Sequence, residues 1–135
     1  MNKNLMDMIK KHEGFRSKPY ICTAGKMTIG YGRNIEDIGI SEQEATFLIK
    51  NDINRSIIEL EFIFSDFNTF SENRQNALID MIFNLGSNRF NSFKKMIKAI
   101  NKNDWNEASI QAENSKWHNQ VKNRALTIER LLKHG

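Results

Sequence analysis

The strongest constraint on the fold is a broad apolar stripe between residues 71 and 86. Its members recur at three- and four-residue spacing, which is typical of a helix with one buried face; they are Ala77, Leu78, Met81, Ile82 and Leu85. Ser71 precedes the stripe as a helix N-cap, and Gly86 follows it where a residue with positive φ commonly ends a helix. We therefore predict that this segment is the central buried helix of a mainly helical protein.

Shorter helical patterns flank this segment on both sides. The pattern of Leu5, Met8, Ile9 and His12 predicts a helix over 4–12 that stops near Gly14. Ser41 and Glu44 form a capping box ahead of a long helix, whose apolar face is Ala45, Leu48, Ile49, Ile53, Ile57 and Leu60. Further helices are predicted over 92–101, over 104–113 with Asp104 as cap, and in a last segment that contains Leu126, Ile128, Leu131 and Leu132.

The stretch after Gly14 has the features of a small sheet. Residues 15–21 and 27–31 read as two strands joined by a turn at 23–25, and Pro19, Gly30 and Gly32 mark edge or irregular positions. We predict a mainly α, α+β fold in a single domain, residues 1–135. A small active-site lobe is expected over about 13–40, with 1–12 and 41–135 forming a helical lobe and 34–40 the junction between the two lobes.

Composition excludes several classes of protein. One cysteine among 135 residues permits no intramolecular disulfide, and no stretch approaches the roughly 20 apolar residues of a membrane span. The first eleven residues are too polar for a secretory signal, so we expect a cytoplasmic protein. The net charge of +4 favours attraction to anionic polymers without choosing among them. His12 and Glu13 match the start of the zinc motif His-Glu-x-x-His, but Arg16 stands at the position of the second histidine. We expect no metal and no cofactor.

The chemistry centres on one carboxyl group at the end of the first predicted helix. Glu13 stands nine positions ahead of Cys22 and fifteen ahead of Thr28, so it is expected to face two small polar side chains on the hairpin. Such a group suits protonation of a departing sugar oxygen beside a held water, provided that burial keeps the acid protonated near neutral pH. Glu13 is therefore the candidate general acid.

Glu13, Cys22 and the run Thr28-Ile29-Gly30-Tyr31-Gly32 resemble the catalytic signature of the phage-type lysozymes, glycoside hydrolase family 24. Residues 74–86 resemble that family's central helix, and residues 91–93, 115–120 and 123–125 resemble later segments in the same order. The resemblance implies a lysozyme-like fold with two lobes and a shortened substrate lobe, because only eight residues separate Gly32 from Ser41.

The resemblance also implies roles for individual residues. Many relatives have aspartate at the position of Cys22, which we expect to position water together with Thr28; a thiolate favoured by Lys26 or Arg33, and a small apolar filler, are the alternatives. Arg33 stands where the family often has histidine, and Arg124 either holds the lobe that contains Glu13 against the helical lobe by an ion pair or is solvated. Trp105 and Trp117 either stack on sugars or belong to the core. The expected substrate contacts are Gly32, Asn34, Phe83, Asn84, Ser92, Gln111 and Asn119.

The expected function is that of an endolysin, which cuts the β-1,4 bond between N-acetylmuramic acid and N-acetylglucosamine in peptidoglycan. We expect a monomer that waits in the host cytoplasm until a holin releases it to the periplasmic wall. A virion-associated lysozyme and a lytic transglycosylase are the near alternatives. A peptidase using Cys22 and His118, and a basic nucleic-acid binder formed by residues 116–130, are distant ones, and we expect no nucleic-acid partner.

Overall fold

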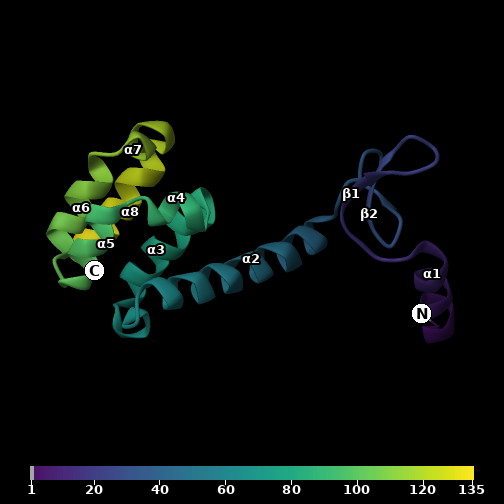
Figure 1. Ribbon diagram of the computed structural model, residues 1–135, viewed down its shortest axis with the longest axis horizontal. Helices are drawn as coiled ribbons and strands as arrows, with labels where there is room; N and C mark the ends of the chain where they lie inside the picture. The colour runs from purple at the N-terminus through teal and green to yellow at the C-terminus, as the bar shows by residue number, and fades with distance from the viewer. Residues whose placement is uncertain (1) are drawn as a thin grey trace. The chain divides into compact units, whose positions relative to one another are not determined.

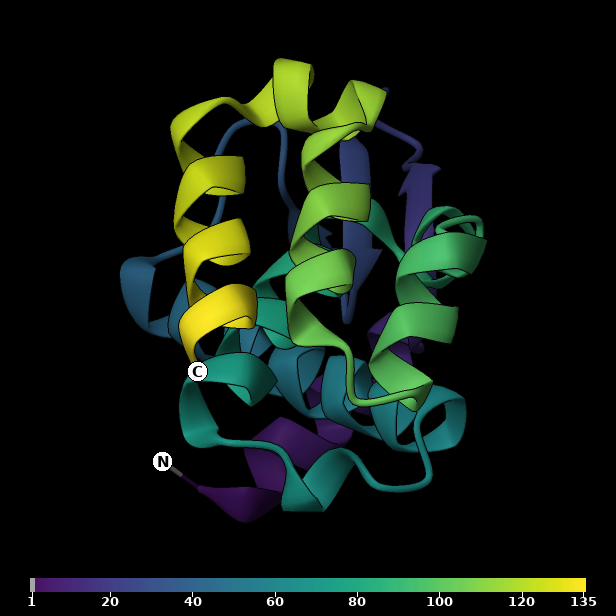
Figure 2. The same cartoon turned by 90° about the vertical axis from the view of Figure 1, so that its left-hand side faces the viewer.

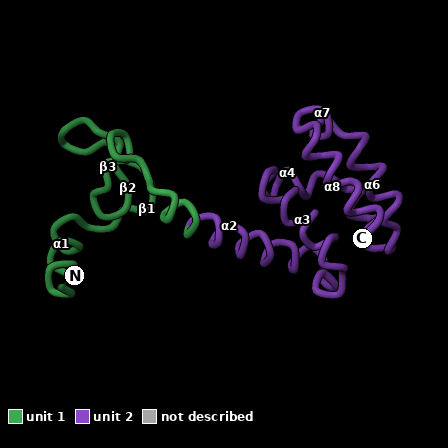
Figure 3. The backbone as a smooth tube through the Cα atoms, turned by 180° about the vertical axis from the view of Figure 1, so that it is seen from behind, with its two compact units in different colours: residues 1–47 green, residues 48–135 purple. Residues whose placement is uncertain are grey.

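The computed structural model describes residues 2–135. They fall into two compact units, Met1–Phe47 and Leu48–Gly135, and the division lies inside the long helix α2 (Glu42–Ile63). Figure 3 colours the two units separately. The predicted division into lobes, with residues 1–12 in the helical lobe, stays a prediction.

The first unit begins with helix α1 (Lys3–Glu13). The Asn2 side chain accepts a hydrogen bond from the Asn4 backbone N–H at 2.8 Å, and the N–H of Gly14 closes the last turn on the Lys10 carbonyl. Gly14 has φ +71°, a conformation that costs glycine no Cβ clash. The predicted helix over 4–12 is therefore confirmed and extends one residue further at each end.

A three-stranded antiparallel sheet follows, with the order β1-β2-β3. The strands are β1 (Arg16–Ile21), β2 (Met27–Gly30) and β3 (Arg33–Asn34), so the predicted hairpin is confirmed and β3 is an addition. The register between β1 and β2 is irregular between Arg16 and Tyr20, the segment that contains Pro19. A proline cannot donate to a ladder, and β1 lies at the edge of the sheet, where that loss is tolerated.

Helix α2 begins with the predicted capping box. The Ser41 hydroxyl accepts from the Glu44 N–H at 3.1 Å, and the Glu44 carboxylate accepts from the Ser41 N–H at 2.9 Å. These reciprocal bonds satisfy two backbone donors that the first turn leaves without helical partners.

The second unit is helical throughout. After α2 come the 3-10 turn η1 (Phe67–Thr69), α3 (Glu72–Leu85), α4 (Ser87–Asn91), α5 (Lys94–Asn101), α6 (Trp105–Glu113), α7 (Lys116–Val121) and α8 (Asn123–His134). Figure 1 labels these helices, and Figure 2 shows α5, α6 and α8 side by side, with α6 in the middle. Helix α3 packs against α8.

Helix α3 is the centre of the core, as its apolar stripe predicted. All five stripe residues are buried, the Ser71 hydroxyl caps the helix through the Arg74 N–H, and Gly86 ends it with φ +80°. The aromatic side chains of Phe64, Phe67 and Phe90 are fully enclosed around it. Trp105 and Trp117 are 6% and 3% exposed, so both tryptophans belong to the core.

Several expectations from the pattern need correction. In the apolar faces predicted for α1 and α2, five members are between 44% and 50% exposed: Leu5, Met8, Ile9, Leu48 and Ile49. The helix predicted over 92–101 begins at Lys94, because the short α4 and a turn occupy the preceding residues. Leu126 is 49% exposed, whereas Ile128 and Leu132 of the same helix are buried, so Leu126 lies outside the apolar face of α8. Helix α7 was not predicted, because six residues are too few to show a period. Within residues 2–135, no helix combines the length and apolar character that a bilayer span requires.

Candidate active site

Glu13 is the last residue of α1, and its carboxylate lies against the backbone of Gly32. A Cβ atom built on Gly32 would stand 2.7 Å from Oε2 and 2.9 Å from Cδ of Glu13, so any other residue at position 32 would force this carboxyl group to move. Gly32 also has φ +78°, where any other residue is strained. Gly32 was predicted as a substrate contact. In the structure, the group that lies close to its backbone is the carboxylate of Glu13.

Aromatic contacts hold the end of α1 beside the same turn. The Tyr31 ring lies 5.5 Å from the Phe15 ring between centroids, and the Lys10 ammonium stands 5.2 Å from the Tyr31 centroid. Position 31 directly precedes Gly32, so these contacts favour the approach of Glu13 to the turn. The Glu13 side chain is nevertheless exposed. Residues 1–47 therefore do not exclude water from this carboxyl group.

Cys22 follows the end of β1 and enters the tight turn to β2. Its N–H donates to the Lys26 carbonyl at 2.9 Å, and its own carbonyl accepts from Gly25 at 2.9 Å. The side chain is partly exposed and forms no disulfide. Thr28, on the central strand β2, is 3% exposed, and its hydroxyl donates to the Lys26 carbonyl at 2.9 Å. The hairpin therefore brings Cys22 and Thr28 together at the Lys26 carbonyl, whereas the expectation that Glu13 faces them stays a prediction.

The surroundings of Cys22 favour its thiolate. Its pKa is lowered from the ordinary value of 9.0, first by a hydrogen bond with the Lys26 backbone and then by the Thr28 hydroxyl and the Ala24 backbone. The Thr28 hydroxyl carries one proton, so it cannot donate to the Lys26 carbonyl and to a thiolate at once. The backbone hydrogen bonds can therefore stabilise a thiolate at Cys22 while Thr28 keeps its bond to that carbonyl, whereas the contribution of Thr28 requires its hydroxyl to rotate.

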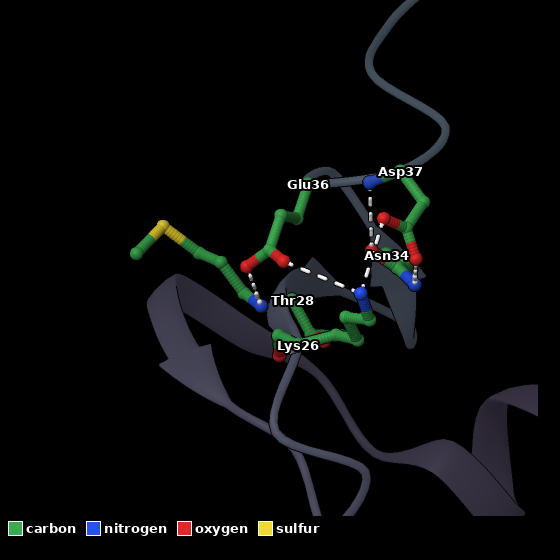
Figure 4. A network of polar contacts seen from close by, with 6 residues as sticks. Lys26, Thr28, Asn34, Glu36 and Asp37 are labelled. Carbon is green, nitrogen blue, oxygen red and sulfur yellow. Dashed lines mark hydrogen bonds and ion pairs between the residues drawn. The ribbon is translucent and has the colours of Figure 1, made fainter.

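The two cations considered as partners of Cys22 are engaged with carboxylates. The Lys26 ammonium lies 3.5 Å from Glu36 and 3.4 Å from Asp37, and Figure 4 shows this network. Asn34 joins it, because its amide donates to Asp37 at 3.0 Å and accepts from the Asp37 N–H at 3.1 Å. One amide hydrogen of Asn34 is left over, so a sugar contact at this position remains chemically possible.

Arg33 forms a two-pronged ion pair with Glu44. Its Nη1 and Nη2 donate to Glu44 Oε1 and Oε2 at 3.0 and 2.6 Å, and Nη1 also reaches the Gly39 carbonyl at 3.0 Å. The Arg33 guanidinium lowers the Glu44 pKa to about 2, with the Ser41 backbone amide contributing next. The arginine therefore ties β3 to the start of α2, which is a supporting role for the hairpin that carries Cys22 and Thr28.

In the second unit, two predicted sugar contacts lie near one hollow. The Asn84 side chain, on α3, accepts from the Trp117 indole N–H at 2.9 Å. Trp117 and Ser92 both line a hollow of about 360 Å³, together with Phe93 and residues of α7. The Ser92 hydroxyl itself donates to the Arg89 carbonyl at 2.5 Å.

Other predicted contacts of this unit lie elsewhere. Phe83 is 40% exposed and lines a second, mainly apolar hollow of about 320 Å³ with Asp80 and Arg124. Gln111 lines a third hollow and donates to Glu107 at 2.8 Å, while Asn119 is exposed on α7. The helical unit therefore does not gather all of its predicted contacts around one hollow.

Arg124 has a partner on α3. Its Nε donates to Asp80 Oδ1 at 2.6 Å, and its Nη2 donates to the Asp80 carbonyl at 3.2 Å. Asp80 was not predicted as this partner, since 44 residues separate the pair and no local pattern links them. The bond connects α3 to the start of α8.

A second pair that the pattern does not reveal is buried between α7 and α8. His118 Nδ1 lies 2.7 Å from Glu129 Oε2, and the two side chains are 23% and 8% exposed. Burial raises the Glu129 pKa; His118 acts in the opposite direction, and the charge of Glu113 adds to the rise. The imidazole nitrogen is thereby engaged in a structural pair, which counts against a peptidase with His118 as its base. Within the described chain, no cluster of three or more metal-binding side chains is found.

Comparisons with known proteins identify the family of the chain. The family described as phage lysozyme matches residues 10–132. The chain is 29% identical to probable T4-type lysozyme 2 of Dictyostelium discoideum, over all of this chain and 96% of that protein. It is 32% identical to the endolysin of Acyrthosiphon pisum secondary endosymbiont phage 1, over 82% of this chain and 74% of the endolysin.

A further relative is a much longer protein. The chain is 26% identical to the pre-baseplate central spike protein Gp5 of Enterobacteria phage T4, over 99% of this chain but only 28% of that protein. The family match covers Glu13, Cys22, Thr28 and Gly32 together with the whole of α3. The chain therefore belongs to the phage lysozyme family, whose members are glycosidases that cleave peptidoglycan.

Proposed function

We propose that this protein is an endolysin-type lysozyme that hydrolyses the β-1,4 bond between N-acetylmuramic acid and N-acetylglucosamine. The observation that carries the proposal is the seating of the Glu13 carboxylate against Gly32, in a chain of the phage lysozyme family. In the proposed reaction, Glu13 protonates the departing sugar oxygen while a water attacks the anomeric carbon.

Cys22 and Thr28 orient that water from the hairpin. The Thr28 hydroxyl has lone pairs left after its bond to the Lys26 carbonyl. The lowered pKa of Cys22 raises the fraction of thiolate, and the thiolate takes up the proton that the attacking water releases. The water stands on the face of the sugar opposite the leaving group, so the product has an inverted anomeric carbon.

The protein acts in this scheme as a monomer. It accumulates in the host cytoplasm and reaches the periplasmic wall through a holin. The similarity to an endolysin at 32% identity supports this role. A virion-associated role is the second candidate, and the similarity to the Gp5 spike protein favours it.

A lytic transglycosylase is the third candidate, because Cys22 stands where many relatives have a carboxylate that assists water. Without that group, the muramic acid hydroxyl can attack in place of water and close an anhydro ring.

Digestion of purified peptidoglycan, followed by mass spectrometry, tests these reactions. Hydrolysis leaves reducing N-acetylmuramic acid ends, transglycosylation leaves anhydro ends, and a peptidase or amidase releases free stem peptides. We expect reducing ends from the wild type and a loss of roughly 10²–10⁴-fold in rate for Glu13→Gln. Glu42→Gln is a matched control, because Glu42 is also exposed and begins α2. Equal rates for Glu13→Gln and the wild type would refute the proposed mechanism.

A further inference from the structure

Helix α5 carries a concentrated positive charge that the proposed reaction does not use. Lys94, Lys95, Lys98 and Lys102 lie at positions that, at 3.6 residues per turn, fall within an arc of about 100°. All four are exposed, and among residues 2–135 the ion pairs include none of them. We call these four residues the lysine face.

The lysine face belongs to the basic half of the helical unit. Residues 86–135 contain ten Lys and Arg against four Asp and Glu, whereas residues 48–85 contain three against six. The opposite side of α5 is packed into the core through Met96, Ala99 and Ile100. Because its apolar side is already buried, α5 has no apolar face to insert into a bilayer, and the lysine face can bind a partner only through charge and hydrogen bonds.

A hollow beside the lysine face indicates the shape of that partner. Lys95, Lys98 and Lys102 line a space of about 270 Å³ between α5 and α6. The two helices lie side by side in Figure 2. A linear polymer can enter such a hollow, whereas a flat lipid surface touches only its rim.

The other side of the hollow suits hydroxyl groups. Asp104, Glu107 and Gln111 complete the lining, with Gln111 donating to Glu107 at 2.8 Å. Asp104 Oδ1 caps α6 through the Glu107 N–H at 3.1 Å. The two carboxylates partly offset the three ammonium groups, but their free oxygens accept hydrogen bonds from hydroxyls. The lining thus combines lysines, which pair with phosphates, and carboxylate and amide side chains, which form hydrogen bonds with hydroxyl groups.

The composition of the hollow also distinguishes among linear phosphate polymers. Proteins that bind single-stranded nucleic acid usually add aromatic side chains on which the bases stack. The residues that line this hollow, all within the described chain, include no aromatic side chain. The hollow therefore fits a polymer of phosphates and hydroxyl-bearing carbons better than a strand with bases.

We propose that the lysine face and the hollow beside it bind a polyol phosphate polymer of the bacterial envelope. The lysines contact successive phosphates, and the Glu107–Gln111 side of the hollow contacts the polyol hydroxyls. Binding there retains the enzyme at the wall between cleavage events. That consequence rests on the proposed function, whereas the binding itself does not.

The test measures binding in a Glu13→Gln background, so that no cleavage interferes. The probe is deacylated poly(glycerol phosphate), titrated at several salt concentrations. Four phosphate contacts predict a slope of log affinity against log salt of about −3, from roughly 0.7 per contact on a single-stranded polyanion. Replacing all four lysines with Gln should bring the slope close to zero and lower the affinity at low salt by about tenfold or more.

A matched variant separates the lysine face from net charge. Lys3, Lys11, Lys18 and Lys50 are also exposed and lie outside α5, so replacing them with Gln removes the same charge. We expect this control to keep its affinity within about threefold and most of its salt slope. An equal loss in both fourfold variants would overturn the proposal, because net charge alone would then explain the binding.

Two further probes decide the identity of the partner. Vesicles containing phosphatidylglycerol test a membrane, and a single-stranded oligothymidylate tests nucleic acid. If either binds more tightly than poly(glycerol phosphate) through the same four lysines, the assignment to a polyol phosphate is wrong. Failure of the proposed function would appear separately, as unchanged peptidoglycan products on adding the wild-type enzyme.

Discussion

The Glu13 carboxylate rests directly on the backbone of Gly32, where a Cβ atom would approach Oε2 to 2.7 Å. The two residues are 19 positions apart, and the turn between β2 and β3 brings them together. The proposed acid is therefore positioned by a missing side chain as much as by its own helix.

Gly32→Ala should displace this carboxylate. The new methyl group would clash with Glu13, and a misplacement of about 1 Å in a catalytic group can cost roughly 10²-fold in rate. Gly30→Ala is the control, because Gly30 also has positive φ, at +71°, but a Cβ there meets nothing within 4 Å. Both variants should lose about 1–2 kcal/mol of stability from backbone strain. Equal activities of the two variants, measured as kcat on peptidoglycan, would show that the contact does not position Glu13.

The Cys22 thiol should ionise at lower pH in the folded protein than in the unfolded chain. Its pKa is lowered by hydrogen bonds, so the rate of alkylation by iodoacetamide should rise at a lower pH than in urea. Thr28→Val removes one of these hydrogen bonds and should move the alkylation midpoint upward. An unchanged midpoint in Thr28→Val would show that Thr28 does not contribute and that the backbone hydrogen bonds alone lower the pKa.

Cys22→Asp should keep or raise the activity. Aspartate supplies a carboxylate, which accepts a water proton more readily than a neutral thiol does. Cys22→Ala should lower the rate of peptidoglycan cleavage, because it removes a group that orients water. A fully active Cys22→Ala, assayed by release of reducing ends, is incompatible with this role for the side chain.

Glu44 should make stability fall in acid. Its folded pKa is about 2 against an ordinary 4.5, so its contribution is complete above pH 4.5 and is lost as the pH falls toward 2. In Glu44→Gln, urea denaturation should show a weaker fall of unfolding free energy over this interval. Glu42→Gln, at the neighbouring exposed position, should keep the wild-type dependence. The same dependence in all three proteins would exclude the ion pair with Arg33 as the cause.

Glu129 should affect stability in the opposite direction. Its pKa is raised by burial, so the protonated carboxyl favours the folded state at low pH, and that contribution is lost as the pH rises through the folded pKa. Glu129→Gln has no titrating carboxyl at this position. Its free energy of unfolding should therefore not fall over the pH range in which the wild type loses this contribution. The groups facing the carboxyl are His118 and Glu113. Because the charge of Glu113 contributes to the raised pKa of Glu129, Glu113→Gln should lower that pKa.

Removing His118 tests the same pair from the other side. His118→Ala leaves a buried carboxylate without its partner and should cost roughly 3 kcal/mol in urea denaturation, at the low end for buried pairs because His118 is 23% exposed. The double variant His118→Phe/Glu129→Leu should recover much of this loss. A cost below about 0.5 kcal/mol for His118→Ala would show that the pair stabilises the fold no more than a solvent-exposed ion pair does.

Much of the fold follows from local sequence. The caps at Ser41, Ser71 and Asp104 form as predicted, because each depends on residues within one helical turn. The buried face of α3 was also predicted, since its period sets the buried side of the helix wherever the helix packs. Short elements escaped prediction: β3 has two residues and α4 has five, and neither length can display a period.

Within the site, the sequence supplied the residue types and the structure supplied their partners. Spacing and resemblance identified Glu13, Cys22 and Thr28, and the structure shows Glu13 against Gly32 and Cys22 beside Thr28. The roles of these residues and the sugar contacts stay predictions. The suggestion that Lys26 or Arg33 favours a thiolate is replaced by hydrogen bonding, since both cations bind carboxylates.

The sequence by itself determined the helix caps, the buried face of α3 and the order of the signature residues, because these depend on interactions between near neighbours in the chain. Only the tertiary structure decided that Arg124 would bind Asp80 and that His118 would share a buried contact with Glu129. Such pairs form between helices that meet only after the core has packed, so no periodicity along the chain records them.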